Sequence, residues 1–421
     1  MKKHFDLIGL ASLILLGPLF IFPNDKWNWV IILAVSALFI GRWIIDKKLL
    51  SKTPIDAPIG LLLVMALTGV FVVKDIEESA AKLAGLVYGI IIFFILVGVL
   101  KTPKRVKSAV ILFLIVGLLL AIVGTLGRLD TRKQIFPSIE SIMPKLPNIN
   151  FRLRGAEDGI NPNPLGGILL LFIPIGMILI HPLTEKGNKL SHLWSKRLGL
   201  IAIIILLIVQ MLALYYSSSF GIWSSLVLSL WLMGEWKRTI KIVFGIILLI
   251  IALGFSLKLS ESKRISNNGI YIRINESFEE RASIWNNTME VVKAHPILGI
   301  GMDQLRRTSK FYYGLSHAHN QFLHSVAELG VPGLISYMAI LIGVFWMAAE
   351  VRKSTLPEWI RLTSRGLRTG IFAFTLFGTV DAVPLGAKPG IFFWISLAIV
   401  TSIFLYGRNN GFMAGYEKQV D

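Results

Sequence analysis

The sequence contains no cysteine. This absence excludes a disulfide framework and any chemistry that depends on a thiol. Charged side chains are also scarce, because they make up only 16% of the 421 residues, whereas a soluble domain carries about 25%. So few charges cannot solvate a surface of this size, so a water-soluble globule is excluded.

Apolar runs fill the space between the clustered charges. Hydrophobic residues make up 54% of the chain, and the runs approach the length of about 18 residues that a helix needs to cross a bilayer. The pattern predicts an all-α polytopic membrane protein with about 12 transmembrane helices. The expected spans are Phe5–Phe22, Trp27–Ile45, Ile55–Val73, Leu83–Leu100, Val106–Leu126, Leu165–Ile180, Leu198–Tyr216, Phe220–Met233, Ile240–Leu257, Val331–Ala349, Leu367–Val383 and Ile391–Tyr406.

These spans divide the chain into five parts. Residues 1–126 hold transmembrane helices 1–5, and residues 127–164 form a first long extracytoplasmic loop. Residues 165–257 hold helices 6–9, and residues 258–320 form a large extracytoplasmic loop that carries the candidate catalytic segment. Residues 321–421 hold helices 10–12. The first apolar run is expected to be a retained span, because no small-residue cleavage site follows it.

The distribution of basic residues indicates the orientation. The net charge is +18, which in a membrane protein indicates basic cytoplasmic loops before it indicates nucleic acid. With both termini in the cytoplasm, the inner segments hold 24 basic residues and the short outer turns hold 4. The two long outer loops hold 6 and 9 more. Long loops cross the membrane regardless of charge, so these cations need another explanation.

The first long loop carries two arginines close together, Arg152 and Arg154. They could present guanidinium groups to an anionic ligand near the membrane surface, or contact lipid headgroups and solvent. Further on, Asn161 and Asn163 each precede a proline, a pairing that favours turns and helix starts.

The second long loop contains the signature of a helix start. Ser277 and Glu280 fit a capping box, with Ser277 as the N-cap. A helix is expected from there to about Ala294, where Pro296 stops it. One face of this helix would carry an apolar stripe made of Ala282, Trp285, Met289 and Val292.

Arg281 lies at the start of this expected helix, where a cation opposes the helix dipole. A negatively charged ligand would relieve that cost, although a salt bridge to a nearby glutamate would do the same. The turn Gly299-Ile300-Gly301, which follows, is only weakly typical of a phosphate-binding loop.

Histidines gather at the end of the same loop. On a helix, His317, Gln321, His324 and Glu328 would share one face, and His319 would point the other way. A zinc site made of His317, His324 and Glu328 is disfavoured, because two turns of one helix do not close a tetrahedron. Interfacial histidines without chemistry remain an alternative. The favoured interpretation is a general base at the membrane surface, because imidazole titrates near neutral pH.

Several segments together resemble a known family. The stretches His317–Leu323 and Glu328–Gly333 resemble the "His-Asn … Glu-x-Gly-x-x-Gly" signature of the O-antigen ligase and polymerase family. Three further stretches look like other motifs of that family in the same order, namely Asn161–Gly167, Arg281–Trp285 and His295–Gly301. The resemblance covers about residues 155–335 and extends to the expected spans and the large outer loop.

The resemblance implies a fold and an activity. Members are similar to all-helical, lipid-linked-sugar transferases of the GT-C-like type. They move a glycan from undecaprenyl pyrophosphate to an acceptor hydroxyl at the outer face of the cytoplasmic (inner) membrane. The acceptor is a lipid A–core sugar, a glycan repeat unit or a protein side chain. The family implies an inverting reaction without metal or other cofactor, with membrane lipids around the protein and no nucleic acid partner.

The resemblance also implies roles for individual residues. His319 would deprotonate the acceptor, and Arg281 would bind the pyrophosphate. The candidate substrate-binding residues are Asn320, His317, Arg152, Arg154, Arg273, Asn161, Asn163 and Glu328.

One position departs from the family pattern. Ligases of the family carry Ser-Arg-Gly at the outer hairpin, and here Phe220 stands where that arginine would be. Either another cation, such as Arg152, Arg154 or Arg273, takes its part, or the chain is a polymerase or belongs to a divergent branch.

Two other functions stay open at this point. A transporter or flippase is favoured by the many spans and by polar residues such as Gln210 and Asp381 in or near them. Against it stand the absence of a detectable internal repeat and the long outer loop. A passive scaffold for a wall-assembly complex is the third possibility.

Overall fold

A computed structural model provides the structure of the chain. It describes residues 51–129, 162–184, 190–217, 219–233, 269–308, 317–383 and 385–413. These residues are helical or lie in turns, and they contain no strand. The expected spans Phe5–Phe22, Trp27–Ile45 and Ile240–Leu257, and residues 130–161 of the first long loop, lie outside the described residues. The all-α class is therefore confirmed for the described part, and the count of twelve spans stays a prediction.

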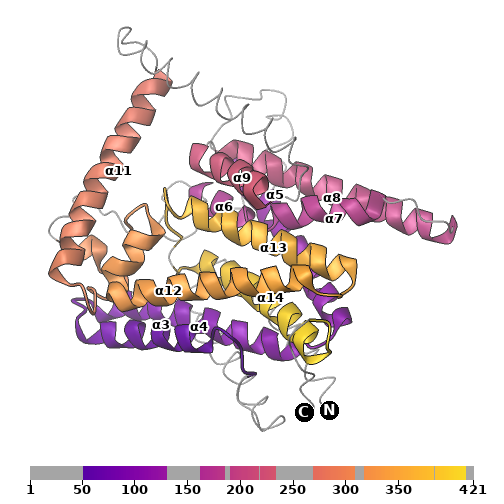
Figure 1. The fold of residues 1–421 in the computed structure, drawn as a ribbon. Coiled ribbons are helices and arrows are strands. Elements are labelled where there is room, and N and C mark those ends of the chain that lie inside the picture. Colours follow the sequence, from indigo (N-terminus) through magenta and orange to yellow (C-terminus); the bar gives the residue numbers. More distant parts are fainter. Residues whose placement is uncertain are drawn as a thin grey trace.

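The α-helices keep the labels of Figure 1. They are α3 (Asp56–Thr68), α4 (Ile76–Val99), α5 (Pro103–Leu129), α6 (Pro162–Leu169), α7 (Ile173–Thr184), α8 (Leu190–Ser217), α9 (Phe220–Met233), α11 (Gly269–Ala294), α12 (Gln321–Lys353), α13 (Glu358–Phe377) and α14 (Ile391–Asn409). The described residues also form the short 3-10 helices η2 (Gly69–Phe71), η6 (Leu305–Arg307) and η7 (Lys388–Gly390).

Five described helices are long and apolar enough to cross a membrane. These candidate spans are Ser79–Val99, Pro103–Ile122, Arg197–Tyr215, Gln321–Lys353 and Ile391–Asn409. Large apolar side chains such as Ile201, Ile208 and Ile342 are exposed on their outer faces. In a bilayer these faces would contact lipid tails, so the chain is a membrane protein by length, composition and exposed surface.

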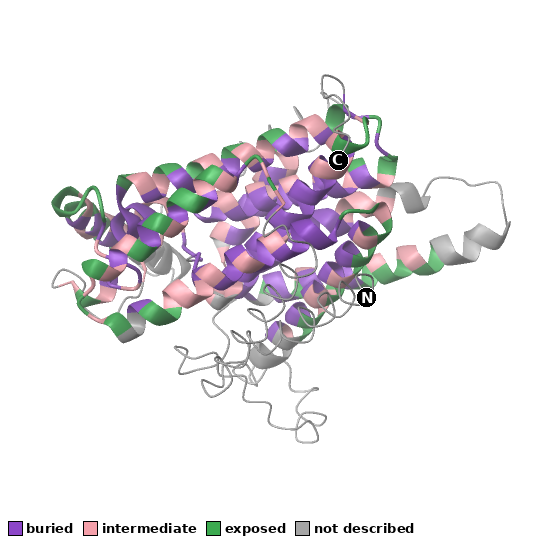
Figure 2. Ribbon diagram, turned by 90° about the horizontal axis from the view of Figure 1, so that it is seen from below, coloured by how far each residue is buried: buried purple, intermediate pink, exposed green. Residues whose placement is uncertain are grey.

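The helices form a bundle in which α12, α13 and α14 pack against one another in the middle. α12 packs against α3 and α14 against α4 on one side, while α13 packs against α7 and α9 on the other (Figure 1). Buried residues fill the middle of the bundle and exposed ones lie on its outside (Figure 2). Trp394 of α14 is fully buried there, and a Cβ at Gly89 of α4 would lie 2.3 Å from its ring. Glycine therefore sets how closely α4 approaches α14.

α11 lies apart from this parallel arrangement. It stands crosswise at the end of the bundle where α12 begins (Figure 1), and it packs against α12. This end gathers the candidate functional residues.

The expected span Leu165–Ile180 is not one continuous helix. It consists of α6 and α7, separated by Leu170–Phe172. Phe172 is fully buried and stacks on Phe113. Pro174 falls in the first turn of α7, where its missing N–H is no loss, so the proline starts a helix and does not bend one.

The expected span Leu367–Val383 is shifted. α13 begins earlier, at Glu358, and ends at Phe377. Its first half carries polar residues such as the exposed Arg361 and the half-buried Arg365, while a buried stripe includes Thr363, Leu367, Gly370 and Phe374. A search for continuous apolar residues misses the amphipathic first half of such a helix. As a result, Asp381 lies in the turn after α13 and not in a span.

Candidate functional site

The chain segment before α12 is held against the turn after α13 by one asparagine. Asn320 is the N-cap of α12, and its side-chain oxygen accepts hydrogen bonds from the backbone N–H groups of Phe322 and Leu323, at 3.0 Å each. Its amide nitrogen donates to the carbonyl of Thr379 at 3.0 Å. The Gln321 N–H donates to the carbonyl of Gly378 at 2.6 Å. Both ends of the Asn320 side chain are thus engaged in joining two segments of the protein.

This junction brings two histidines to one buried carboxylate. Nδ1 of His319 lies 3.0 Å from Oδ1 of Asp381, and Nε2 of His317 lies 3.3 Å from the same oxygen. The Ala382 N–H also donates to Oδ1, at 2.8 Å. The two imidazole rings are 4.3 Å apart and tilted by 50°. The Asp381 side chain is 5% exposed, while each histidine side chain is 21% exposed, so the rings separate the carboxylate from the surroundings.

The helix face expected from residue 317 onward is wrong in its first part. Residues 317–320 precede α12 and are not helical. The His319 backbone has a φ of 47°, a left-handed conformation that is uncommon for residues other than glycine. Such strain persists only where the surroundings enforce it, and it is concentrated at functional positions. Here the Asn320 cap and the Asp381 contact impose it.

The charge states follow from burial and hydrogen bonding. Burial alone would raise the pKa of Asp381, but hydrogen bonds from His317 and His319 hold that pKa well below its usual value. Burial lowers the pKa of His317, and its contact with Asp381 opposes this shift without cancelling it. At neutral pH the group therefore contains an ionised carboxylate beside a neutral His317.

α11 differs from its expected form in two respects. It begins at Gly269, so Ser277 lies inside the helix and is not its N-cap. The end at Ala294, before Pro296, is confirmed. The buried face carries Ile284, Thr288 and Val291, whereas Met289 of the expected stripe is exposed. The capping box at Ser277 is a local pattern and does not fix where the helix begins. Packing against α12 determines which face of α11 is buried.

Arg281 lies well inside α11, so the expected conflict with the helix dipole is absent. The spacing of three residues places it on the same face as Ile284, one turn along, and its side chain is half-buried. Ile284 belongs to a buried cluster with Ala318, Leu305 and Ala327. Ala318 stands between the two histidines in sequence, so α11 and the segment that carries them contribute to the same buried cluster.

The glycine turn after α11 pairs with a break in α12. Gly330 has a φ of 71° and interrupts the helix, and Pro332 cannot supply an N–H to the carbonyl of Glu328. Backbone N–H groups of the turn compensate, because Ile300 donates to Ala327 at 2.9 Å and Gly301 donates to Glu328 at 3.0 Å.

The two segments approach too closely for side chains. A Cβ at Gly330 would lie 1.9 Å from the carbonyl oxygen of Ile297, and a Cβ at Gly299 would lie 2.5 Å from the backbone of Glu328. The glycines therefore serve backbone packing, and Gly299-Ile300-Gly301 does not form an open phosphate cradle.

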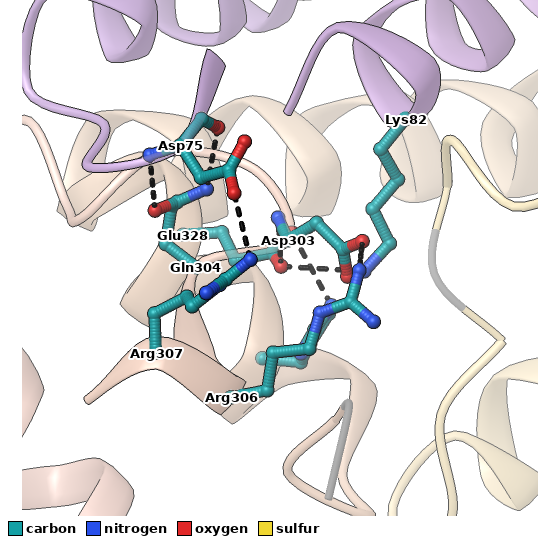
Figure 3. A network of polar contacts seen from close by, with 8 residues as sticks. Asp75, Lys82, Asp303, Gln304, Arg306, Arg307 and Glu328 are labelled. Carbon is teal, nitrogen blue, oxygen red and sulfur yellow. Dashed lines mark hydrogen bonds and ion pairs between the residues drawn. The ribbon is translucent and has the colours of Figure 1, made fainter. Parts of the chain in front are cut away.

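Glu328 lies in a buried network of charges beneath this turn. Its Oε1 accepts from the Asp303 N–H at 2.7 Å and lies 3.4 Å from Nζ of Lys82. Its Oε2 lies 3.2 Å from Nε2 of His324. Lys82 reaches from α4 to both Glu328 and Asp303, as Figure 3 shows, and Arg306 contacts Asp303 on the outer side. These contacts engage both oxygens of Glu328 and favour a structural role for it.

One family model matches this part of the chain. Residues 201–338 match the model described as O-antigen ligase. This match supports the resemblance to the O-antigen ligase and polymerase family that the motifs carry. The matched segment includes Arg281, the glycine turn, both histidines and Asn320. No curated protein matches the chain at a significant level.

The match indicates a glycosyltransferase-like ligase or polymerase. Several of the residues expected from the family motifs cannot be placed. Arg152, Arg154 and Asn161 lie outside the described residues. Asn163 lies in α6 and Arg273 in α11, at positions where only the backbone is described.

Two residues of this site, Asp381 and Lys82, were not predicted as site residues. Asp381 was noted only as a polar residue near a span, and Lys82 only as part of a short outer turn. Both lie outside the matched segment, because Lys82 precedes residue 201 and Asp381 follows residue 338. A polar residue that closes an apolar run, at the same expected membrane side as the histidines, is the signal that would have indicated Asp381.

Proposed function

We propose that this chain transfers a glycan from a polyprenyl pyrophosphate donor, undecaprenyl pyrophosphate, to an acceptor hydroxyl at the outer face of the cytoplasmic membrane. The observation that supports it best is the contact between Nδ1 of His319 and Asp381, at 3.0 Å. With its proton on Nδ1, the imidazole presents the lone pair of Nε2 on its other side. An oriented neutral imidazole is the group that general-base catalysis requires at neutral pH.

In this proposal, His319 removes the proton of the acceptor hydroxyl. The acceptor oxygen attacks the anomeric carbon as the bond from that carbon to the pyrophosphate oxygen breaks. Undecaprenyl pyrophosphate leaves, the proton stays on His319, and the configuration at the anomeric carbon inverts. Asp381 stabilises the imidazolium that forms, in the manner of a carboxylate that orients a catalytic histidine.

Arg281 is proposed to bind the pyrophosphate. A guanidinium is always charged and forms paired hydrogen bonds to phosphate oxygens. In support, Arg281 is half-buried and lies one helical turn before Ile284, which shares a buried cluster with Ala318. Arg152, Arg154 and Arg273 remain candidates for the second cation that Phe220 cannot supply.

The remaining assignments follow from these roles. His317 would contact the acceptor or the donor sugar. Asn320 would hold the segment before α12 in place, and Glu328 would hold the glycine turn in place. The acceptor is another glycan or a lipid A–core sugar. The two termini would lie in the cytoplasm and the site outside, with the prenyl chain among the membrane lipids.

Purified chain in liposomes tests the proposal. The liposomes contain undecaprenyl-pyrophosphate-linked glycan, and the acceptor glycan is added with it. The expected result is free undecaprenyl pyrophosphate together with a lengthened or capped acceptor, both found by mass spectrometry. Movement of the intact donor between leaflets, without any cleavage, would establish a flippase and overturn the proposal.

A further inference from the structure

The carboxylate oxygen at the centre of the site has more nitrogen neighbours than it can accept ideally. A carboxylate oxygen has two lone pairs. Three nitrogens nevertheless face Oδ1 of Asp381, at 2.8 Å from Ala382, 3.0 Å from His319 and 3.3 Å from His317. Two imidazoles and one backbone N–H are thus crowded around a single oxygen.

The same geometry suits a metal ion. The three donor atoms of His317, His319 and Asp381 lie within 4.8 Å of one another. Ligands at about 2.0 Å from a tetrahedral zinc ion are separated by about 3.3 Å, which is close to the two distances seen here. Two imidazoles and one carboxylate form a borderline donor set that Zn²⁺ binds well, with a fourth position left for water.

We propose that His317, His319 and Asp381 bind one Zn²⁺-class transition-metal ion, and that this ion inhibits glycan transfer. The set differs from the His317, His324 and Glu328 site that the sequence disfavoured. His324 and Glu328 pair with each other beneath the glycine turn, whereas His317 joins Asp381 from the turn after α13. Tertiary packing therefore supplies the ligand that one helix could not.

Inhibition follows from the tautomer of His319. A neutral imidazole carries one proton on its two nitrogens. Metal at Nδ1 displaces that proton to Nε2, so the lone pair that would accept the hydroxyl proton is lost. No proton is gained or released by the ring in this exchange. The inhibitory half of the inference rests on the proposed role of His319, while the binding half does not.

Metal binding is measured without any activity. The full chain is purified without a polyhistidine tag and titrated with Co²⁺, whose visible absorption reports tetrahedral coordination, and Zn²⁺ then displaces it. Wild type is expected to bind one equivalent. His317→Gln is expected to weaken metal binding at least about tenfold. Loss of a residue that only hydrogen-bonds to a metal ligand already costs about that much, and loss of a ligand itself should cost no less. His295→Gln, which changes an exposed histidine, should bind as wild type does.

Absence of saturable binding by wild type, or equal affinity of wild type and His317→Gln, would overturn the inference. X-ray absorption of zinc-loaded wild type needs no variant. Scattering from two imidazoles supports the site, and a spectrum without imidazole scattering contradicts it.

The inhibitory half is tested by transfer assays on wild type. Saturating Zn²⁺ is expected to lower the rate at least about 100-fold, the lower bound for loss of a general base, and excess EDTA should restore it. Full activity with zinc bound would overturn inhibition alone. If metal-free wild type never transfers glycan, the proposed function fails, and the spectroscopic titration still decides the metal site.

Discussion

At the scale of single residues, the site depends on one carboxylate that holds two imidazoles. Asp381 is buried, and its pKa is held low by hydrogen bonds from His317 and His319. Its negative charge is therefore present at neutral pH, beside the proposed base. The backbone strain at His319, with φ at 47°, agrees with a side chain that is fixed by its surroundings and not by local preference.

Asp381→Asn tests this positioning. The amide can present its N–H to Nδ1 and so favour the wrong tautomer, as in the serine-protease example where the corresponding change lowers kcat about 10⁴-fold. We expect kcat to fall at least about 100-fold with KM for the donor nearly unchanged, and the acidic limb of the pH–rate profile to move. Asp75→Asn, at a carboxylate that pairs with Arg307, is the control. If kcat of Asp381→Asn falls only in proportion to the fraction of folded protein, Asp381 has a structural role and does not position the base.

Arg281→Lys tests the proposed donor contact. Lysine keeps the charge but loses the paired hydrogen bonds of the guanidinium. KM for the lipid-linked donor is expected to rise at least about tenfold, or about 1.4 kcal/mol, in steady-state assays. Arg307→Lys, at a largely exposed side chain, should leave KM unchanged. Donor kinetics equal to wild type in Arg281→Lys would remove this arginine from the site.

At the scale of elements, the break in α12 and the glycine turn form one unit. Gly330 and Pro332 leave two carbonyls of α12 without helical donors, and Ile300 and Gly301 supply N–H groups to them. The turn also carries Asp303, which meets Glu328 and Lys82. The position of the turn is thus set by both backbone pairing and buried charges.

Gly330→Ala is expected to be strongly destabilising. A Cβ there would meet the Ile297 carbonyl at 1.9 Å, and φ is 71°. Gly411 has a similar φ of 73° but open space around it, so Gly411→Ala isolates the conformational cost of about 1–2 kcal/mol. In thermal unfolding in detergent, Gly330→Ala should lower the free energy of unfolding by about 1–3 kcal/mol more than Gly411→Ala does, which is the range for overpacking. Equal losses would show that the two segments do not pack this closely.

The elements also show what local sequence patterns can and cannot predict. The end of α11 before Pro296 and the extent of α9 were predicted, because proline and continuous apolar residues act locally. The start of α11 was wrong, since the Ser277 capping box was outweighed by the longer helix. Asp381 was expected inside a span, because hydropathy cannot detect that amphipathic α13 begins at Glu358 and ends at Phe377.

At the scale of the whole molecule, the chain is a membrane bundle with its candidate site at one end. Five described helices could cross a bilayer. The His317, His319 and Asp381 group lies in turns before α12 and after α13, and α11 crosses the bundle at the end where α12 begins (Figure 1). The family motifs indicated His319 and Arg281 from the sequence, but Asp381 is brought to His319 only by packing of α12 against α13.

The proposed orientation is testable because the chain has no cysteine. Ala294 and Lys353 are exposed, at the ends of α11 and α12. We expect Ala294→Cys to react with a membrane-impermeant maleimide on intact cells, and Lys353→Cys to react only after permeabilisation. The reverse pattern would put the histidines on the cytoplasmic side, where the proposed donor glycan would not be found.

The central claim is that the imidazole of His319 takes the proton of the acceptor. The most direct measurement is the single-turnover rate of glycan transfer by purified His319→Asn. Asparagine tolerates positive φ and can still donate to Asp381, but it cannot act as a base. The account predicts a loss of about 10²–10⁴-fold with folding intact and with His295→Asn at the wild-type rate. A His319→Asn variant that transfers glycan at the wild-type rate would contradict it.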